Sequence, residues 1–257
     1  MATAIRRHLS ENLKRVRDRI QAACARVGRS PDEVTLVAVT KYVGVDVIRQ
    51  LVELGQLDIG ESRVQELTKR AAMLHESSAR LRGPSLMEEG PGPRWHMIGH
   101  LQRNKVRSVL PWVQTIHSVD SLRLAEDMDA EADRLERRIP ILMQVNVSDE
   151  KTKFGVAVGA AIHLAEQIVT LKHLSLIGLM TMAPLVEDER WGRNCFARLR
   201  ELLEELRHER FGTPQMRHLS MGMSHDFEWA IEEGATMVRI GSALFEGIEQ
   251  FTESPGA

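Results

Sequence analysis

The sequence is poor in cysteine, in long apolar runs and in charge of one sign, and each shortage excludes a class of protein. Its two cysteines, Cys24 and Cys195, belong to no CxxC motif, which argues against a disulfide scaffold or a zinc site and favours a reducing, cytoplasmic compartment. Lysine and arginine number 34 against 36 aspartate and glutamate residues, so the basic field of a nucleic-acid-binding protein is absent. No apolar run approaches the ~20 residues that span a membrane, and no secretory signal opens the chain.

Short β-rich runs alternate with amphipathic stretches along most of the chain. Apolar residues at helical spacing from Ile5 to Ile20 predict a first helix, which Gly28 ends. Eight β-rich runs follow, at 34–39, 56–60, 95–99, 113–118, 139–147, 174–181, 216–221 and 236–241. Strands that alternate with helices form a parallel sheet. Eight such units in 257 residues predict an α/β fold, a single (β/α)8 barrel of the TIM type with an extra N-terminal helix.

An open, doubly wound sheet is the rival architecture. No Gly-x-Gly-x-x-Gly motif follows the first run, which weakens this rival without excluding it. We expect one domain over 1–257, because no linker or long repeat divides the chain. Residues 82–94, which hold three prolines and three glycines, predict a flexible loop on the face of the barrel opposite the active site, and 251–257 predict a frayed tail.

A lysine, Lys41, stands two residues after the first β-rich run, where a barrel places its active site. In one interpretation its side chain only extends to solvent from the barrel mouth. In the other, partial desolvation lowers the pKa of the amine, so that it attacks a carbonyl and forms a Schiff base. The pattern alone leaves both open.

Two Gly-Ser turns follow the seventh and eighth runs. The first spans Gly222–Ser224, with Ser224 as the expected N-cap of a helix that begins at His225; the second is Gly241 and Ser242. Backbone N–H groups and hydroxyls at such turns bind phosphate, and many barrels place a phosphate site after these two strands. The alternative is that both are ordinary capped turns.

An arginine, Arg239, lies between Val238 and Ile240 in the last apolar run. A buried guanidinium keeps its charge and therefore needs an acceptor. That acceptor is either a carboxylate or carbonyl within the barrel, or a ligand atom such as an aromatic ring nitrogen. A lysine, a phosphate cradle and a ring-facing arginine are together typical of a pyridoxal phosphate site.

At this point the sequence resembles a known family, the pyridoxal phosphate homeostasis proteins, single-domain barrel proteins related to the N-terminal domain of alanine racemase. The matching segments follow in one order over about residues 5–248. They are VAVTK (37–41), IGES with VQE (59–66), WHMIGHLQRNK (95–105), HSVDS (117–121), QVNVSDEKTKFG (144–155), GLMTM (178–182), LSMGMSHDFEWAI (219–231) and VRIGSALFEG (238–247).

The resemblance implies a role for each matching position. Lys41 would be the Schiff-base lysine and Arg239 the partner of the pyridine nitrogen. The expected phosphate-binding residues are Ser220, Gly241 and Ser242, with backbone amides near Met221 and Ser224. The run Leu179–Met182 is more typical of barrel core than of a cofactor site, and packing of Met182 on the cofactor ring is the alternative.

Three positions depart from the family's usual pattern. Ser62 stands where the family usually has an asparagine near the cofactor and would replace its polar contact in part. His225 stands where an acidic residue is usual, and Glu246 interrupts the usual Phe-Gly.

The resemblance implies a monomer that holds pyridoxal phosphate and supplies it to apo-enzymes, with little or no turnover. The residues agree: the only tyrosine is Tyr42, beside Lys41, so no partner acid for racemisation is evident. Catalytic relatives add a β-domain, for which we expect no room after the eighth run. An amino-acid racemase or decarboxylase of the same barrel type is the alternative, and a phosphate-binding Schiff-base aldolase is a third hypothesis.

Histidines and further lysines add two weaker signals. His96, His100 and His117 are expected near the mouth of the site by the resemblance, but their spacing is not that of a metal motif, so we expect no metal. Lys151 and Lys153 follow the fifth run; they belong either to a surface loop or to a second place where an aldehyde reacts.

Overall fold

The strands form a closed parallel barrel. The computed structural model describes residues 2–81, 92–148, 154–183 and 188–248. Its strands are β1 (Thr35–Val39), β2 (Asp58–Glu61), β3 (Arg94–Met97), β4 (Val113–Val119), β5 (Ile139–Asn146), β6 (Val156–Ala157), β7 (Leu174–Met180), β8 (His218–Ser220) and β9 (Met237–Ile240). Their order is β4-β3-β2-β1-β9-β8-β7-β5-β6, and a further pairing of β4 with β5 closes the ring. Eight strands thus form the closed ring, and the two-residue β6 pairs with β5 outside it. The predicted eight-stranded barrel is therefore confirmed.

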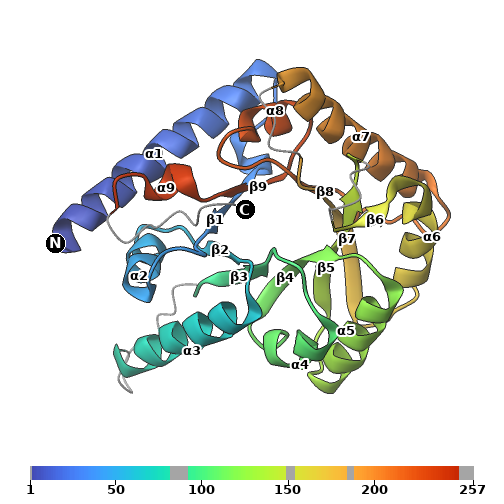
Figure 1. Ribbon diagram of the computed structural model, residues 1–257, viewed down its shortest axis with the longest axis horizontal. Coiled ribbons are helices and arrows are strands. Elements are labelled where there is room, and N and C mark those ends of the chain that lie inside the picture. The colour runs from blue at the N-terminus through green and yellow to red at the C-terminus, as the bar shows by residue number, and fades with distance from the viewer. Residues whose placement is uncertain (1, 82–91, 149–153, 184–187, 249–257) are drawn as a thin grey trace.

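Helices surround the strands, as Figure 1 shows. They are α1 (Ala2–Arg26), α2 (Val45–Glu53), α3 (Val64–Leu81), α4 (Val106–Val109), α5 (Leu122–Arg134), α6 (Val158–Ile168), α7 (Glu189–His208), α8 (Phe227–Glu232) and α9 (Ser242–Phe245), with 3-10 turns at Pro31–Glu33 and Arg103–Lys105. Among the described residues, no helix is both long enough and apolar enough to cross a membrane.

The structure corrects the expected elements in four places. The two-residue strand β6 and the four-residue helix α9 were not expected, because elements so short show no periodicity. The stretch 101–110 is a 3-10 turn followed by α4 rather than one helix. Arg94 belongs to β3 rather than to the expected loop 82–94: it lies in register with Asp58 of β2, and its guanidinium pairs with that carboxylate. The remainder of that loop up to residue 91, and the tail 251–257, lie outside the described residues.

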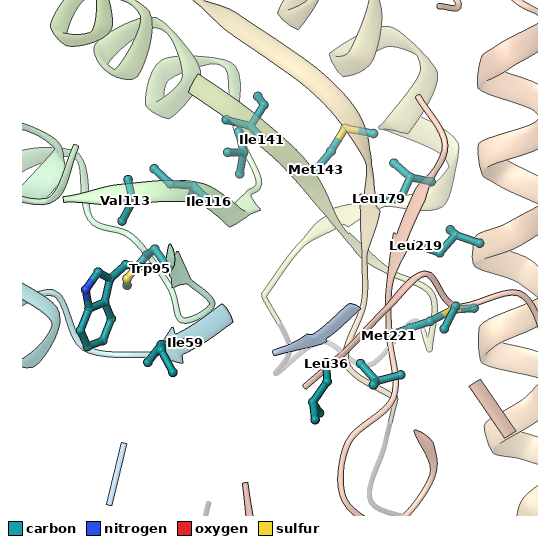
Figure 2. Close-up of a cluster of buried hydrophobic side chains, with 14 of the residues drawn as sticks. Leu36, Ile59, Trp95, Val113, Ile116, Ile141, Met143, Leu179, Leu219 and Met221 are labelled. Atoms are coloured by element: carbon teal, nitrogen blue, oxygen red, sulfur yellow. The ribbon is translucent and has the colours of Figure 1, made fainter. Parts of the chain in front are cut away.

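Side chains alternate between two layers, one on each face of the strands. Leu36, Ile59, Trp95, Ile116 and Ile141 are buried in the large apolar cluster that the strands share with the surrounding helices. Figure 2 shows these side chains distributed around the ring of strands. Burial of this layer supplies the main driving force for closing the barrel.

The barrel interior is partly polar. Leu142, Met180 and Met237 form a small separate apolar cluster. Elsewhere in the interior, Nδ1 of His117 on β4 lies 2.8 Å from the hydroxyl of Ser220 on β8. These two strands are not neighbours in the sheet, so this contact crosses the interior. Polar groups in such a place need internal hydrogen-bond partners, because water does not reach them.

Helix α1 confirms the predicted N-terminal helix and packs beside α8 and α9 (Figure 1). Its apolar stripe is buried from Leu9 to Ile20. Asn12 on the same helix donates hydrogen bonds to the carbonyls of Leu244 (3.0 Å) and Glu246 (2.9 Å). The helix thereby supports the segment that follows β9.

Candidate functional site

Three neighbouring strands bring the expected site residues to one end of the barrel. Strand β9 lies between β1 and β8, and the three run parallel, so their carboxyl ends share one edge. Lys41 follows β1, the turn at Gly222–Ser224 follows β8, and Gly241 follows β9. The barrel topology thus places the lysine next to both Gly-Ser turns, at the end where such barrels carry their function.

The amine of Lys41 is available for chemistry. Its Nζ lies 4.7 Å from the ring centroid of Tyr42, a cation–π contact. Within the part of the chain that the structure describes, Lys41 forms no ion pair. Its main chain is held by two guanidinium groups: Arg63 donates to the carbonyl of Lys41 (3.0 Å), and Arg70 donates to the carbonyl of Thr40 (2.8 Å). The backbone is therefore fixed while the amine stays free.

A buried ion pair anchors the turn beside this lysine. Glu61, at the end of β2, is fully buried and accepts a hydrogen bond from Arg70 at 2.5 Å. Its other oxygen accepts from the backbone N–H groups of Ser62 (2.7 Å) and Arg63 (3.1 Å). Because all these groups are paired, burying the charges is tolerated and the β2–α3 turn is held rigidly. Ser62 is half-buried, and its hydroxyl lies 3.5 Å from Glu61, so its expected cofactor contact stays a prediction.

Ser224 does not cap helix α8, contrary to the sequence-based expectation. The N-cap of α8 is Asp226, whose carboxylate accepts from the backbone N–H of Met223 at 2.6 Å. Ser224 instead turns toward the second Gly-Ser turn, where its hydroxyl accepts from the backbone N–H groups of Gly241 (3.3 Å) and Ala243 (3.4 Å). The reason is tertiary: β8 and β9 are adjacent, so the two turns meet.

These long hydrogen bonds mark a place suited to an anion. Backbone N–H groups that meet only a neutral hydroxyl at 3.3–3.4 Å would bind a phosphate oxygen more strongly, because charge-assisted hydrogen bonds are shorter and stronger. Ser242 is half-buried beside them. The backbone N–H of Met221, by contrast, already bonds the carbonyl of Met237 at 3.1 Å and belongs to the strand ladder.

Arg239 is almost completely buried in the barrel interior, with 3% of its surface exposed. Its guanidinium donates to the hydroxyl of Ser220 (2.7 Å) and to the carbonyl of Thr181 (2.8 Å). Burial lowers the pKa of Arg239 to about 10, and the nearby charge of Asp226 opposes that shift. Both contacts are to neutral acceptors, and they use two of the five N–H groups of the guanidinium.

Ser220 in turn joins a series of hydrogen-bonded side chains whose connection was not evident from the sequence. The hydroxyl of Ser220 lies 2.8 Å from Nδ1 of His117, and Nε2 of His117 lies 2.9 Å from Nδ1 of His96. Nε2 of His96 lies 3.0 Å from a carboxylate oxygen of Asp58, which also pairs with Arg94. The hydroxyl of Ser220 is thus occupied by protein partners, and its expected phosphate contact stays a prediction.

The histidines lie deeper than the resemblance implied. His96 and His117 are inside the barrel, 3% and 0% exposed, rather than at its mouth. His100 alone is near the rim, stacked on Phe154 with ring centroids 4.4 Å apart. Among the described residues, no three potential metal ligands cluster together. The signal in the sequence was the occurrence of His96 and His117 within apolar runs, which requires buried partners.

Three further residues were expected at or near the site: Met182, Lys151 and Lys153. Met182 follows β7 and is 41% exposed, so it is free to cover a ligand at the barrel mouth. Lys151 and Lys153 lie outside the described residues.

The ionised form of Asp58 stabilises the fold, and this makes a testable pH dependence. Burial raises the pKa of Asp58, but hydrogen bonds from Arg94 and His96 outweigh it and lower the pKa to about 2, from an ordinary 3.8. A lowered pKa in the folded state means that stability, about 2 kcal/mol, is present above pH ~4 and is lost as the pH falls toward ~2.

Asp58→Asn is therefore expected to lower the free energy of unfolding by about 2 kcal/mol at neutral pH, and by about half as much near pH ~3. Urea titrations at both pH values measure the difference between the variant and the original chain. An equal difference at both would contradict the assigned role of the carboxylate charge.

The geometry provides an amine nucleophile after β1, a cluster of backbone donors for an anion after β8 and β9, and a buried cation on β9, the strand between β1 and β8. Such a set suits a small phosphorylated aldehyde with an aromatic ring. Comparison with known proteins addresses this directly. The family model described as alanine racemase, N-terminal domain, matches residues 11–248.

Individual relatives that match most of the chain point to the same family. A pyridoxal phosphate homeostasis protein of Aquifex aeolicus is 40% identical over 235 residues, 91% of this chain and 96% of its own. Among solved structures, an unknown protein from Bifidobacterium adolescentis is 40% identical with a TM-score of 0.86, covering 94% of this chain and 96% of that one. PipY of Synechococcus elongatus with PLP bound is 32% identical with a TM-score of 0.76, covering 92% and 99%. The chain therefore belongs to the alanine racemase N-terminal domain family, and within it to the group of the pyridoxal phosphate homeostasis proteins.

Proposed function

We propose that this protein binds pyridoxal 5'-phosphate through a covalent bond between the amine of Lys41 and the aldehyde, and that it stores and delivers the cofactor with little or no turnover. The observation that carries the proposal is the free amine of Lys41 beside the two Gly-Ser turns on adjacent strands. The names of the relatives and the PLP-bound structure of PipY support it.

The residues fit the cofactor part by part. The backbone N–H groups of Gly241 and Ala243 would hold the phosphate, with the hydroxyls of Ser224 and Ser242 beside them. Arg239 would face the ring nitrogen with its remaining N–H groups, and Met182 would cover the ring. When bound, the cofactor supplies a reactive aldehyde and an electron-withdrawing ring.

Two features of the chain favour storage over catalysis. A cation such as Arg239 at the ring nitrogen disfavours protonation of that nitrogen, and the unprotonated ring is the weaker electron sink. Tyr42, the only tyrosine, lies against the amine of Lys41 itself rather than across from it. A single base can capture and release an aldehyde, but inversion of an amino acid needs a second acid on the opposite face.

The proposed recipients are apo-enzymes that require pyridoxal phosphate, and the proposed working form is a cytoplasmic monomer. Delivery follows from reversible chemistry: the bond between an amine and an aldehyde exchanges with other amines, so a site that holds the cofactor without consuming it can pass it on.

One experiment tests storage against catalysis. The purified protein is loaded with pyridoxal phosphate, and one portion is reduced with borohydride, digested and analysed by mass spectrometry, with the label expected on Lys41. A second portion is mixed with an apo-enzyme whose activity reports transfer, and a third is assayed for racemisation and decarboxylation of amino acids. Turnover at typical enzyme rates, ~1–1000 per second, would replace storage by the enzymatic alternative.

A further inference from the structure

A chain of five side chains crosses the barrel interior from Arg239 to Asp58. Arg239 contacts Ser220 at 2.7 Å, Ser220 contacts His117 at 2.8 Å, His117 contacts His96 at 2.9 Å, and His96 contacts Asp58 at 3.0 Å. The side chains come from β9, β8, β4, β3 and β2, so the chain joins both sides of the closed sheet. Four of the five are at most 3% exposed.

The direction of every hydrogen bond follows from the two ends of this chain. Arg239 has only donors, so the oxygen of Ser220 must accept from it. The ionised carboxylate of Asp58 has only acceptors, so Nε2 of His96 must carry a hydrogen. If His96 is neutral, its Nδ1 is then an acceptor, and Nε2 of His117 must donate to it.

The last link is thereby determined. A neutral His117 with its hydrogen on Nε2 has an acceptor at Nδ1, which takes the hydroxyl hydrogen of Ser220. All four bonds then point the same way, from Arg239 to Asp58, and the hydroxyl hydrogen of Ser220 and the ring N–H groups of both histidines are all used. The hydroxyl hydrogen of Ser220 is then used by His117, so this inference replaces the phosphate contact that the resemblance implied for Ser220, and toward Arg239 the hydroxyl acts as an acceptor only.

We propose that His117 and His96 are positioning residues for the cofactor site, which hold Ser220 as a fixed acceptor and so orient the ring-facing guanidinium of Arg239. This inference rests on the proposed function, in which Arg239 faces the ring nitrogen. Each hydrogen bond in such a series polarises the next, so the carboxylate of Asp58 makes the hydroxyl oxygen of Ser220 a stronger acceptor for Arg239, whose two hydrogen-bond partners, Ser220 and the carbonyl of Thr181, are neutral.

The surroundings favour neutral histidines. Burial lowers the pKa of His117 well below its usual range, and the nearby positive charge of Arg239 lowers it further. The charged groups around these five hydrogen-bonded side chains are Arg94 beside Asp58, Asp226 near Arg239, and Arg217 near His218. The alternative has both nitrogens of His96 protonated, with His117 donating to Ser220. That arrangement would bury a second cation, a protonated His96, in the barrel interior, where the carboxylate of Asp58 is already paired with Arg94.

The tautomers can be read without any cofactor. Long-range ¹H–¹⁵N NMR spectra of the unloaded protein at neutral pH distinguish a histidine with hydrogen on Nε2 from one with hydrogen on Nδ1 or on both. We expect His96 and His117 to be neutral, both with hydrogen on Nε2. Hydrogen on Nδ1 of either ring would overturn the inferred direction.

A matched pair of variants tests the link to the cofactor. Asparagine and leucine have similar size, but only the asparagine side chain offers an acceptor near the position of Nδ1. His117→Leu is expected to weaken pyridoxal phosphate affinity about tenfold and to shift the visible absorption of the loaded protein, because Ser220 loses its fixed orientation. His117→Asn is expected to recover most of the affinity, to within roughly threefold.

The outcomes separate the inference from the proposed function. If borohydride labels Lys41 in both variants but their affinities and spectra are equal, the positioning role is refuted while the storage function stands. If Lys41 of the original chain is not labelled, the storage function fails, whatever the histidine tautomers are. Thermal unfolding of both variants ensures that the comparison is made between folded proteins.

Discussion

Replacing Lys41 by alanine is expected to abolish covalent loading with pyridoxal phosphate completely. The variant should show no visible absorption of a bound aldehyde and no label after borohydride reduction, because no other described amine stands at the carboxyl end of β1 beside the two Gly-Ser turns. The fold should survive, since the amine forms no ion pair within the described residues and the main chain at this position is held by Arg63 and Arg70.

The matched control is Lys69→Ala, which removes an exposed lysine from α3. It should load like the original chain. Absorbance titration and mass spectrometry measure both variants, and thermal unfolding checks that both are folded. A label that persists in Lys41→Ala would show that another lysine carries the cofactor, with Lys151 and Lys153 the first to examine.

Gly178→Ala is expected to produce the largest loss of stability. Gly178 lies on β7 opposite His218 of β8, and a Cβ atom built there would be 1.9 Å from the carbonyl oxygen of His218. That neighbour is strand backbone in a closed barrel, so it cannot move without separating β7 from β8. We expect a loss of about 3 kcal/mol or more, as for overpacked cores.

Differential scanning calorimetry should show a melting temperature lower by roughly 10 °C for a chain of this size. Gly159→Ala is the control: it lies in the first turn of α6, and a Cβ atom there would meet nothing within 4 Å. Alanine favours a helix over glycine, so the control should gain up to about 1 kcal/mol. Equal melting temperatures for the two variants would mean that β7 and β8 are less closely held than the structure shows.

Gly178→Ala should also weaken cofactor binding, because β8 carries Ser220 and leads into the turn with Ser224. Ser220 accepts from Arg239 and contacts His117, so a displaced β8 would disturb the buried chain of hydrogen bonds as well. Stability and cofactor binding are coupled here through one strand pairing.

The order of elements and the position of Lys41 follow from the sequence alone. Alternation of β-rich and amphipathic runs is a local property, and eight units in 257 residues leave few architectures besides a barrel. A parallel barrel puts all strand carboxyl ends at one face, so Lys41, Gly241 and Ser224 were predictable as neighbours. Short elements such as α9 were not, because four residues carry no periodicity.

The partners of the buried polar groups were decided only by the tertiary structure. The sequence requires an acceptor for Arg239 but does not say which, and the fold supplies Ser220 and the carbonyl of Thr181. His117 and Ser220 are 103 residues apart and meet only because β4 pairs with β5 and closes the ring. Local patterns encode which face a side chain takes, whereas contacts across a barrel depend on its closure, and no short segment of sequence carries that information.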